Sequence, residues 1–277
     1  MDPLGKVHAS RLAVSIVLYR PEHQVLIRTL RSLERACSHA TKAGGVSEVH
    51  LVLTDHSPQA ATMGQIERWQ QVCSAIKTHY HHNPRNPGFG AGHNAAFRRF
   101  ERADFFLVAN PDLEFADDSL MGGLSFLAAR PSVGVIAPTL DEGVGVRPAC
   151  FSYPSLAGIV LRGLGVSATK SRAVAHYECR HWNVSEPVLE PPLMSGCCLL
   201  FRASAYAELG GFDPAYFLYF EDFDLSVRAR KARLSAYCPD MRVKHTGGGA
   251  GRKGLRHQLL YLRSAWRFFS TCGWRGC

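Results

Sequence analysis

The sequence lacks any hydrophobic run long enough to cross a membrane. Its first apolar run, residues 12–19, has eight residues, whereas a helix that spans a bilayer needs about 20. The amino end also shows no pattern of a signal peptide. We therefore expect a cytoplasmic protein that is soluble or that sits on a membrane without crossing it.

Cysteine pairs at metal-binding spacing are also absent. The nine cysteines include no C-x-x-C pair, and the adjacent Cys197 and Cys198 have poor geometry for a disulfide with each other. An odd number of cysteines without a pairing pattern fits reduced thiols in a cytosolic protein. A zinc site is therefore not expected.

Acidic residues are outnumbered by basic ones. There are 23 Asp and Glu against 32 Lys and Arg, which gives a formal net charge of +9 and a pI near 9.2. This balance favours anionic partners such as nucleotides, phospholipid surfaces or nucleic acid. The chain has neither a recognisable DNA-binding motif nor an aromatic-basic RNA signature, so we expect no nucleic-acid partner.

The rest of the composition is that of a globular protein. Hydrophobic residues make up 46% and charged residues 20% of the 277 residues. In the first part of the chain, apolar runs of strand type alternate with segments of helical spacing. This alternation predicts an α/β fold in which a parallel sheet carries helices on both faces. The predicted strands are residues 12–18, 49–53 and 75–80, and the predicted helices are residues 22–35 and 59–72.

A short apolar run at residues 105–108 ends abruptly in an Asn-Pro-Asp sequence. Pro111 cannot donate to a sheet ladder, so Asp112 is expected at the carboxyl end of a buried strand, beside the amide of Asn110. Ligands collect at such strand ends in open α/β sheets. A carboxylate there suits a divalent cation that carries a phosphate. The alternative is a simple turn without chemistry.

The next distinctive stretch is rich in glycine. Gly88, Gly90 and Gly92 allow close approach of the backbone to a ligand, and a helix is expected to open at Asn94, with free amide groups that can hold an anion. A Rossmann dinucleotide fingerprint does not fit, because His93 stands at the third glycine position and a polar loop precedes the glycines. A glycine-rich surface turn is the other interpretation.

The middle of the chain is harder to interpret. A helix at residues 119–129 and a strand at residues 133–137, ending at Pro138, are expected before a Gly-, Pro- and Ser-rich stretch at residues 141–192. That stretch has a weak helical patch near residues 156–164, and it predicts either a lid beside an active site or a passive excursion. Residues 193–202 then predict a strand in which Gly196 allows close approach of a substrate.

Two acidic residues stand at the front of a predicted helix in the last third. Glu221 and Asp222 follow an aromatic wall made of Tyr216, Phe217, Tyr219 and Phe220. A carboxylate held against such a wall can have a raised pKa and act as a general base, although acidic residues at a helix start are often only dipole partners. His245, at the mouth of a glycine loop, is a candidate metal ligand or a structural histidine.

In their order and spacing, these segments resemble one known family. They are LAVSIVLY at 12–19, NPRNPGFGAGHN at 83–94, LVANPD at 107–112, SGCCLLFR at 195–202 and GGFDPAYFLYFEDFDL at 210–225, with Asp55 and His245. The chain resembles family 2 inverting glycosyltransferases with a GT-A fold, and among them bacterial rhamnosyltransferases most. The resemblance runs from about residue 12 to residue 269. It implies one domain at residues 10–270, with a mostly parallel, Rossmann-like sheet flanked by helices.

The resemblance also implies that the two halves of the chain bind different substrates. Residues 10–140 would bind the sugar nucleotide, and residues 141–270 the acceptor. Asp55 would bind the pyrimidine base. The nucleotide pocket near the base and diphosphate would be lined by Asn86, Gly88 and Asn94.

Metal and catalytic roles are implied in the same way. Asn110 and Asp112 stand at the D-x-D-type metal motif, with Asp112 carrying Mg²⁺ or Mn²⁺, and His245 matches a position that reaches the metal in some members. Asp222 matches the general base, and Glu221 would support it. Gly196 and Tyr219 would lie on the acceptor side.

The expected donor is dTDP-rhamnose, ahead of a UDP-hexose or UDP-galactofuranose. The expected acceptor is a saccharide or a lipid-linked saccharide of a cell-surface polysaccharide. The basic tail YLRSAWRFFSTCGWR at residues 261–275 predicts peripheral contact with the inner face of the cytoplasmic membrane, or else an ordinary amphipathic closing helix. Two other classes stay open, a nucleotidyltransferase and a non-catalytic protein that binds sugar nucleotides or lipid surfaces.

This chain departs from the family pattern at two places near the predicted sites. Asp55-His56-Ser57 is one residue tighter than the Asp-Asn-x-Ser of many relatives. Lys231-Ala232-Arg233 stands where the helix after the acidic pair usually closes on glycine, so this helix is expected to continue.

Overall fold

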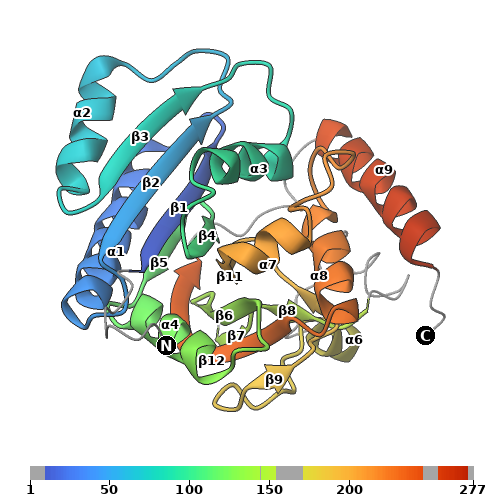
Figure 1. Ribbon diagram of the computed structural model, residues 1–277. Coiled ribbons are helices and arrows are strands. Elements are labelled where there is room, and N and C mark those ends of the chain that lie inside the picture. The colour runs from blue at the N-terminus through green and yellow to red at the C-terminus, as the bar shows by residue number, and fades with distance from the viewer. Residues whose placement is uncertain (1–9, 144, 154–170, 246–254, 274–277) are drawn as a thin grey trace.

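The computed structural model describes residues 10–143, 145–153, 171–245 and 255–273, and every structural statement below concerns these residues. They form a ten-stranded sheet with helices on both faces (Figure 1). Buried apolar side chains of the sheet and its helices make one large core.

The first four strands of the sheet pair in parallel. β1 (Arg11–Leu18) lies between β2 (Glu48–Asp55) and β4 (Phe105–Ala109), and β3 (Lys77–His82) extends the sheet beyond β2. β1 and β4 are almost continuously apolar because both of their faces are covered. The predicted parallel sheet is confirmed in this part of the chain.

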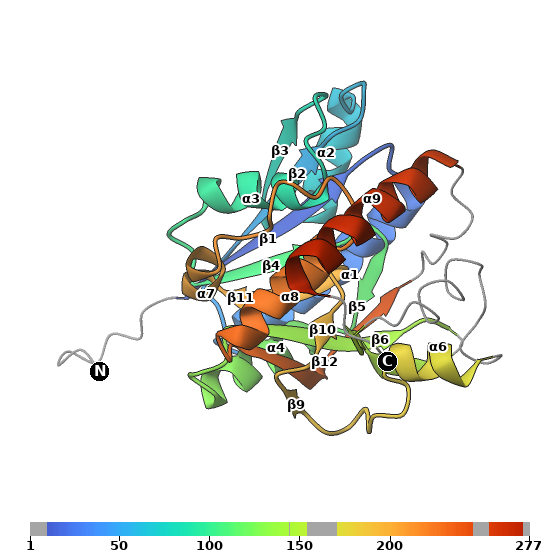
Figure 2. The same cartoon turned by 90° about the vertical axis from the view of Figure 1, so that its right-hand side faces the viewer.

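The helices of this half divide between the two faces. α1 (His23–Lys42) packs with α2 (Met63–Val72) and α4 (Ser119–Ala129) on one side, and α3 (Phe89–Arg99) packs on β1 and β2 from the other (Figures 1 and 2). α1 buries Leu26, Leu30, Leu33 and Cys37, which recur at helical spacing. The bounds of α4 are those predicted from the sequence.

The second half of the chain completes the sheet through a reversed strand. β11 (Cys198–Arg202) pairs antiparallel with β4 on one side and with β6 (Val135–Asp141) on the other. β12 (Ser235–His245) runs parallel to β6, and β5 (Leu113–Phe115) pairs antiparallel with β12. The main path is therefore β3-β2-β1-β4-β11-β6-β12-β5.

Short elements surround this path. β7 (Val146–Pro148) pairs with β6, β9 (Val188–Leu189) pairs with β12, and β8 (Cys150–Phe151) pairs with β10 (Leu193–Met194). The helices are α6 (Arg172–Tyr177), α7 (Ala203–Glu208), α8 (Glu221–Lys231) and α9 (Leu255–Cys272). The Gly-, Pro- and Ser-rich stretch at residues 141–192 thus contains β7, β8, α6 and β9. Its predicted helical patch at residues 156–164 lies outside the described residues.

A second, smaller core holds α8 and α9 together. Its members are mostly aromatic and come from the loop before α8, from α6, α8 and α9, and from β8 and β10. α8 and α9 lie side by side in both views (Figures 1 and 2). The buried residues are Phe151, Tyr177, Leu193, Tyr216, Phe220, Phe223, Ala265, Phe268 and Phe269.

Three strand predictions are corrected by the structure. β6 does not end at Pro138, because the register of β12 shifts opposite this residue and no ladder bond to the proline is needed. The strand predicted at residues 193–202 is divided into β10 and β11. Residues 235–238 and 242–245, which the sequence predicts as two short extended pieces, form one strand, β12, with that irregularity inside it.

The helix after the glycine-rich loop also begins earlier than predicted. α3 starts at Phe89 and not at Asn94, so Gly90 and Gly92 lie within its first turns. A Cβ on Gly90 would lie 2.5 Å from the Cβ of Phe212, and one on Gly92 would lie 2.7 Å from a methyl of Val17. These two glycines therefore permit close packing of α3.

No helix of the four described ranges has both the length and the apolar character that crossing a membrane requires.

α8 ends in a way that the sequence did not predict. The helix stops at Lys231, and Arg233 takes the left-handed conformation, with φ of 57°. The N–H groups of Leu234 and Arg233 donate to the carbonyls of Ala229 and Arg230, which is the pattern of a Schellman motif. Arg233 thus occupies the position at which glycine is favoured.

We expect Arg233→Gly to raise the free energy of unfolding by about 1 kcal/mol, because glycine adopts this conformation without steric cost. Arg230→Gly, three residues earlier and within the helix, should lower it by about 1 kcal/mol. Urea denaturation of the full chain measures both changes. Equal effects of the two substitutions would contradict the assignment.

Candidate active site

The turn after β4 brings Asp112 to an edge of the sheet. The N–H of Asn110 donates to the carbonyl of Cys197 at 2.8 Å, which holds this turn beside the chain that enters β11. Asp112 directly precedes β5, whose Leu113 pairs with His245 of β12. The pairing brings Asp112 Oδ1 to 3.2 Å from His245 Nε2. The structure thus brings together the two predicted metal ligands, which are 133 residues apart in the chain.

This pair suits a cation that arrives with a phosphate. A carboxylate and an imidazole supply two ligands, and the described residues contain no group of three or more His, Cys, Asp and Glu side chains that could hold a metal ion. Mg²⁺ in nucleotide sites commonly uses one or two carboxylates together with substrate phosphates and water. The donor set therefore fits a cation shared with a diphosphate better than a closed protein site.

Asp222 begins α8 and is held by backbone N–H groups. Its Oδ2 accepts the N–H of Gly196 at 2.8 Å, and its Oδ1 accepts the N–H of Phe223 at 2.9 Å. A Cβ on Gly196 would lie 2.8 Å from the Cβ of Asp222. The Asp222 side chain therefore lies against Gly196, at the place where any other residue would carry its Cβ.

Ser226 fastens the same region from one turn further along α8. Its hydroxyl donates to the carbonyl of Asp222 at 2.6 Å and accepts the N–H of Met194 at 2.9 Å. Met194 lies in β10, two residues before Gly196. Sequence analysis missed Ser226, because a serine inside a helix gives no signal of a contact with a strand 32 residues away.

Cys197 lies near both carboxylates, those of Asp112 and Asp222. The pKa of its thiol is raised to about 11, chiefly by burial, and the negative charges of Asp112 and Asp222 are smaller causes in the same direction. Both carboxylates therefore lie near one buried thiol, at the point where the chain enters β11. The predicted metal residue and the predicted base thus converge on residues 196 and 197.

Glu221 differs from its neighbour. Its side chain is buried, and burial raises its pKa well above the ordinary value, with the negative charge of Asp222 as a second cause. The raised pKa that the aromatic wall predicted for a carboxylate is found at this residue. Burial favours the neutral form of Glu221, which keeps a second negative charge away from Asp222.

The residues just before the acidic pair have strained backbone. Tyr219 has φ of 70° and Phe220 has φ of 63°, both in the left-handed region. Such conformations cost about 1–3 kcal/mol each for residues other than glycine and often occur at functional sites. The aromatic wall is thus also a tightly wound turn into α8.

The Asp55 end of β2 faces a cleft. The carboxylate of Asp55 accepts the N–H of Ser57 at 2.8 Å and the hydroxyl of Tyr80 at 2.7 Å. It borders a cleft of about 510 Å³ at the carboxyl ends of β1 and β2. The other lining residues include Arg20, Gln65 and Trp69. The geometry suits a flat polar group, and Asp112 is not part of this wall.

Asn86, Gly88 and Asn94 have internal roles in the structure. Asn86 has φ of 45°, and its side-chain oxygen accepts the N–H of Gly88 at 3.3 Å. A Cβ on Gly88 would lie 2.3 Å from the carbonyl oxygen of Phe217. Asn94 accepts the N–H of Phe212 at 3.0 Å and donates to its carbonyl at 2.7 Å. Through these contacts, Gly88 and Asn94 join the glycine-rich loop to the loop before α8.

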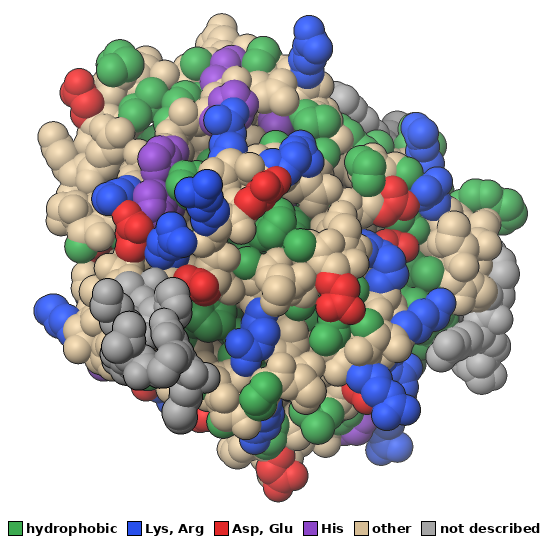
Figure 3. Space-filling view, in the orientation of Figure 1, with side chains coloured by type: hydrophobic (Ala, Val, Ile, Leu, Met, Phe, Trp, Pro, Cys, Tyr) green, Lys and Arg blue, Asp and Glu red, His purple; other side chains and the backbone are tan. Residues whose placement is uncertain are grey.

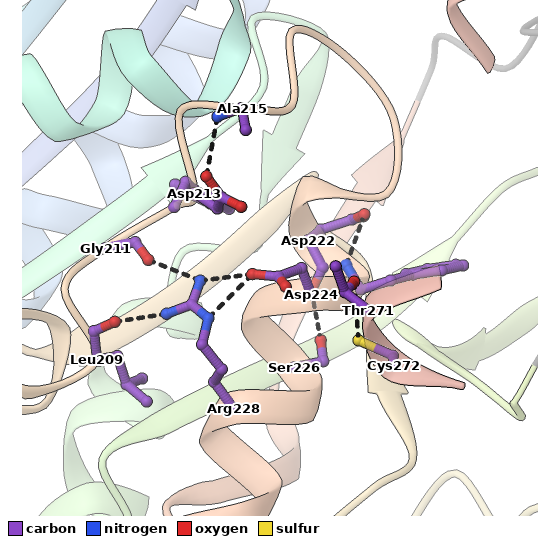
Figure 4. A network of polar contacts seen from close by, with 12 residues as sticks. Leu209, Gly211, Asp213, Ala215, Asp222, Asp224, Ser226, Arg228, Thr271 and Cys272 are labelled. Carbon is purple, nitrogen blue, oxygen red and sulfur yellow. Dashed lines mark hydrogen bonds and ion pairs between the residues drawn. The ribbon is translucent and has the colours of Figure 1, made fainter. Parts of the chain in front are cut away.

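Arg228 of α8 holds the start of the loop between α7 and α8. It donates to the carbonyls of Leu209 and Gly211, and it forms an ion pair with Asp224 at 2.8 Å (Figure 4). Asp224 and Arg228 are at i,i+4 spacing, which the sequence does reveal. The two carbonyl contacts depend on the path of the chain and were not predicted.

Comparisons with known proteins agree with this architecture. No protein-family model matches the chain. Among solved structures, GalNAc-T7 with UDP, GalNAc and Mn²⁺ superposes with a TM-score of 0.65 at 14% identity, covering 96% of this chain and 48% of that one. The mannosyltransferase of Pyrobaculum calidifontis with GDP-Man and Mn²⁺ gives 0.59 at 17% identity, covering 94% and 65%. The chain has the GT-A fold of glycosyltransferases.

Relatives found by sequence carry matching names. N-acetylglucosaminyl-diphospho-decaprenol L-rhamnosyltransferase of Mycobacterium tuberculosis is 34% identical over 182 residues, covering 62% of this chain. The rhamnosyltransferase WbbL of Escherichia coli is 26% identical over 194 residues, covering 66% of this chain and 70% of its own. The chain matches 57% of the length of the mycobacterial relative. The predicted resemblance to GT-A glycosyltransferases, and to rhamnosyltransferases among them, is confirmed.

We expect Gly196→Ala to lower the free energy of unfolding by about 1–3 kcal/mol, because the new methyl would overlap Asp222. Gly64→Ala is the matched control: nothing lies within 4 Å of a Cβ at this position, which is in α2. That change should raise the free energy of unfolding by up to about 1 kcal/mol, since alanine has a higher helix propensity than glycine. Urea denaturation compares the two, and a stable Gly196→Ala protein would contradict the close contact.

Proposed function

We propose that the chain is an inverting glycosyltransferase that moves rhamnose from dTDP-rhamnose to a saccharide or lipid-linked acceptor in cell-surface polysaccharide synthesis. The observation that carries the proposal is the convergence of the Asp112–His245 pair and Asp222 on residues 196 and 197. In this proposal residues 10–140 bind the donor and residues 141–270 bind the acceptor, within one domain at residues 10–270.

The donor would be held between two parts of the first half. The cleft beside Asp55 would take the pyrimidine base, with the carboxylate of Asp55 already oriented by Ser57 and Tyr80. Asp112 and His245, with the turn at Asn110, would hold Mg²⁺ or Mn²⁺ near the diphosphate. When bound, this cation offsets the negative charge that grows on the departing nucleoside diphosphate.

Asp222 would remove the proton from the acceptor hydroxyl. Its two oxygens accept N–H groups from Gly196 and Phe223, so its orientation is set before a substrate binds. The hydroxyl then attacks the anomeric carbon from the face opposite the diphosphate, and one displacement inverts the configuration. Glu221, whose neutral form is favoured by burial, supports Asp222 without adding charge. Tyr219, in the turn before α8, would border the acceptor.

The names of the relatives support the choice of donor and acceptor. Two of them are named rhamnosyltransferases, and the mycobacterial one is named for a decaprenol-linked acceptor. A relative from Haloferax volcanii, 22% identical over 220 residues, is named a hexosyltransferase, which supports the alternative of another hexose in place of rhamnose. A non-catalytic protein that binds sugar nucleotides is the second alternative. A nucleotidyltransferase fits less well, because it gives Asp222 no role.

We expect dTDP-rhamnose to be hydrolysed or transferred only when Mg²⁺ or Mn²⁺ is present. Asp222→Asn should lower turnover about a thousandfold, since a positioned general base contributes roughly 10²–10⁴-fold. Binding of dTDP should be retained, because Asp222 does not line the Asp55 cleft. The measurement is product release from dTDP-rhamnose, a UDP-hexose and UDP-galactofuranose, with calorimetric binding of each nucleotide.

The matched control is Asp117→Asn, an exposed aspartate paired with Arg35, which should keep wild-type turnover. Turnover of a UDP donor alone would replace rhamnose in the proposal. Binding without turnover of any donor, in the presence of saccharide acceptors, would favour the non-catalytic alternative. Nucleotide binding that is independent of the metal and unchanged in Asp112→Asn would contradict the proposed role of Asp112 as a ligand of the cation.

We further propose that α9 rests on an anionic membrane surface, which would place the protein at the inner face of the cytoplasmic membrane. Three large apolar side chains at helical spacing, Leu259, Leu262 and Trp266, are exposed on α9. The helix contains no acidic residue, and Arg263 is exposed between them. An amphipathic helix with this pattern suits the interface of a bilayer. In Figure 3 Lys and Arg side chains are frequent over the right-hand part of the face, where α8 and α9 lie.

We expect Leu262→Gln to weaken binding to vesicles of phosphatidylglycerol and phosphatidylethanolamine roughly tenfold, because it removes one apolar side chain from the interface. Leu189→Gln is the matched control, since Leu189 is 61% and Leu262 64% exposed and Leu189 lies in β9. Co-sedimentation at low and high salt measures both. Equal binding of the two variants would contradict this orientation of α9.

A further inference from the structure

The inner face of α9 holds the strained turn that precedes Asp222. Each residue from 218 to 220 has a contact with this helix. The hydroxyl of Ser264 donates to the carbonyl of Leu218 at 2.8 Å. The hydroxyl of Tyr219 lies 3.0 Å from His257 Nδ1. The ring of Phe220 packs against Tyr261, Phe268 and Phe269, with centroid separations of 5.1, 5.5 and 6.3 Å.

These contacts fall on the part of the turn whose backbone conformation is energetically least favourable. Tyr219 and Phe220 are two successive residues in the left-handed region, and neither is glycine. Conformations of this kind persist only when the surrounding structure imposes them. α9 supplies that constraint from outside, because its contacts fall on the carbonyl before the strained pair and on both strained side chains.

The opposite side of the same loop rests on the donor half. The N–H of Phe89 donates to the carbonyl of Phe217 at 3.0 Å, and Gly88 leaves no room for a side chain there. Arg267 of α9 pairs with Asp213 near the start of the loop, at 3.0 Å. The loop is therefore clamped between the glycine-rich segment and α9, and it leads directly into Glu221 and Asp222.

We propose that α9 positions Asp222, with Ser264 and His257 as positioning residues that act through the turn at residues 218–220. This inference rests on the proposed function, in which Asp222 takes the proton of the acceptor. Asp224, in the first turn of α8, donates its N–H to the carbonyl of Phe220 at 2.9 Å. If α9 no longer held the turn, this first hydrogen bond of α8 would shift. The carboxylate of Asp222 would then move relative to its two N–H donors, Gly196 and Phe223.

The first test compares Ser264→Ala with Ser270→Ala. Ser264 is buried and bonded to Leu218, whereas Ser270 is exposed on the same helix, so the chemical change is the same in both. Ser264→Ala should lower kcat for hydrolysis of dTDP-rhamnose roughly three- to tenfold, the effect of one lost hydrogen bond. The KM for dTDP-rhamnose and the stoichiometry of dTDP binding should not change, and Ser270→Ala should match wild type. Tyr219→Phe, which removes the contact with His257, should act in the same direction.

Two results would overturn the proposal. The first is a kcat of Ser264→Ala equal to that of Ser270→Ala. The second is a loss of kcat matched by an equal loss of dTDP-binding stoichiometry, since that stoichiometry counts folded molecules and would indicate only a structural role.

Hydrogen exchange provides a readout that needs no activity. The amides of Phe223 and Asp224 should exchange faster in Ser264→Ala than in Ser270→Ala, while amides of β1 exchange at the same rate in both proteins. Unchanged exchange at Phe223 and Asp224 would overturn the positioning role whether or not the chain turns over dTDP-rhamnose. If wild type turns over no donor, the proposed function fails by itself, and exchange alone decides how α9 acts on the turn.

Discussion

The hydrogen bond from the N–H of Gly196 to Asp222 joins the two parts of the candidate site. It requires a residue without a Cβ at position 196, because any side chain there would meet Asp222. It also requires β11 to run antiparallel between β4 and β6, since this path carries residues 196 and 197 past the turn at Asn110. The reversed strand in an otherwise largely parallel sheet is therefore what brings the proposed cation-binding pair close to the proposed base.

Charge in this site is arranged by burial as much as by residue type. Asp222 keeps two N–H donors, while the adjacent Glu221 is buried and its pKa is raised. Two neighbouring carboxyl groups thus have different environments, and burial favours the neutral form of Glu221. Cys197 follows the same rule, because burial and the two nearby aspartates keep its thiol protonated. The proposed base is therefore the carboxylate that the backbone holds from two sides.

The loop between α7 and α8 connects regions that are distant in the chain. Asn94 bonds both backbone groups of Phe212, Gly88 packs against Phe217, and α9 holds the turn at Tyr219. The first half of the chain and its last described helix thus meet on one loop. This arrangement gives a physical reason for two strained aromatic residues next to the acidic pair, because contacts on both sides offset the cost of their conformation.

Several features of this protein were determined by the sequence alone. The parallel strands, the bounds of α4 and the position of Asp112 after a buried strand follow from apolar runs and from Pro111, which act through near neighbours. The order of motifs was also sufficient to identify the resemblance to GT-A glycosyltransferases.

Tertiary structure alone decided the partners of several residues. Asn94 meets a residue 118 positions away, Gly196 approaches Asp222, and Arg233 adopts a conformation usual for glycine. Pro138 stays inside β6 because β12 is irregular opposite it. Local patterns cannot reveal such contacts, because they depend on which distant backbone the fold brings within a few ångströms.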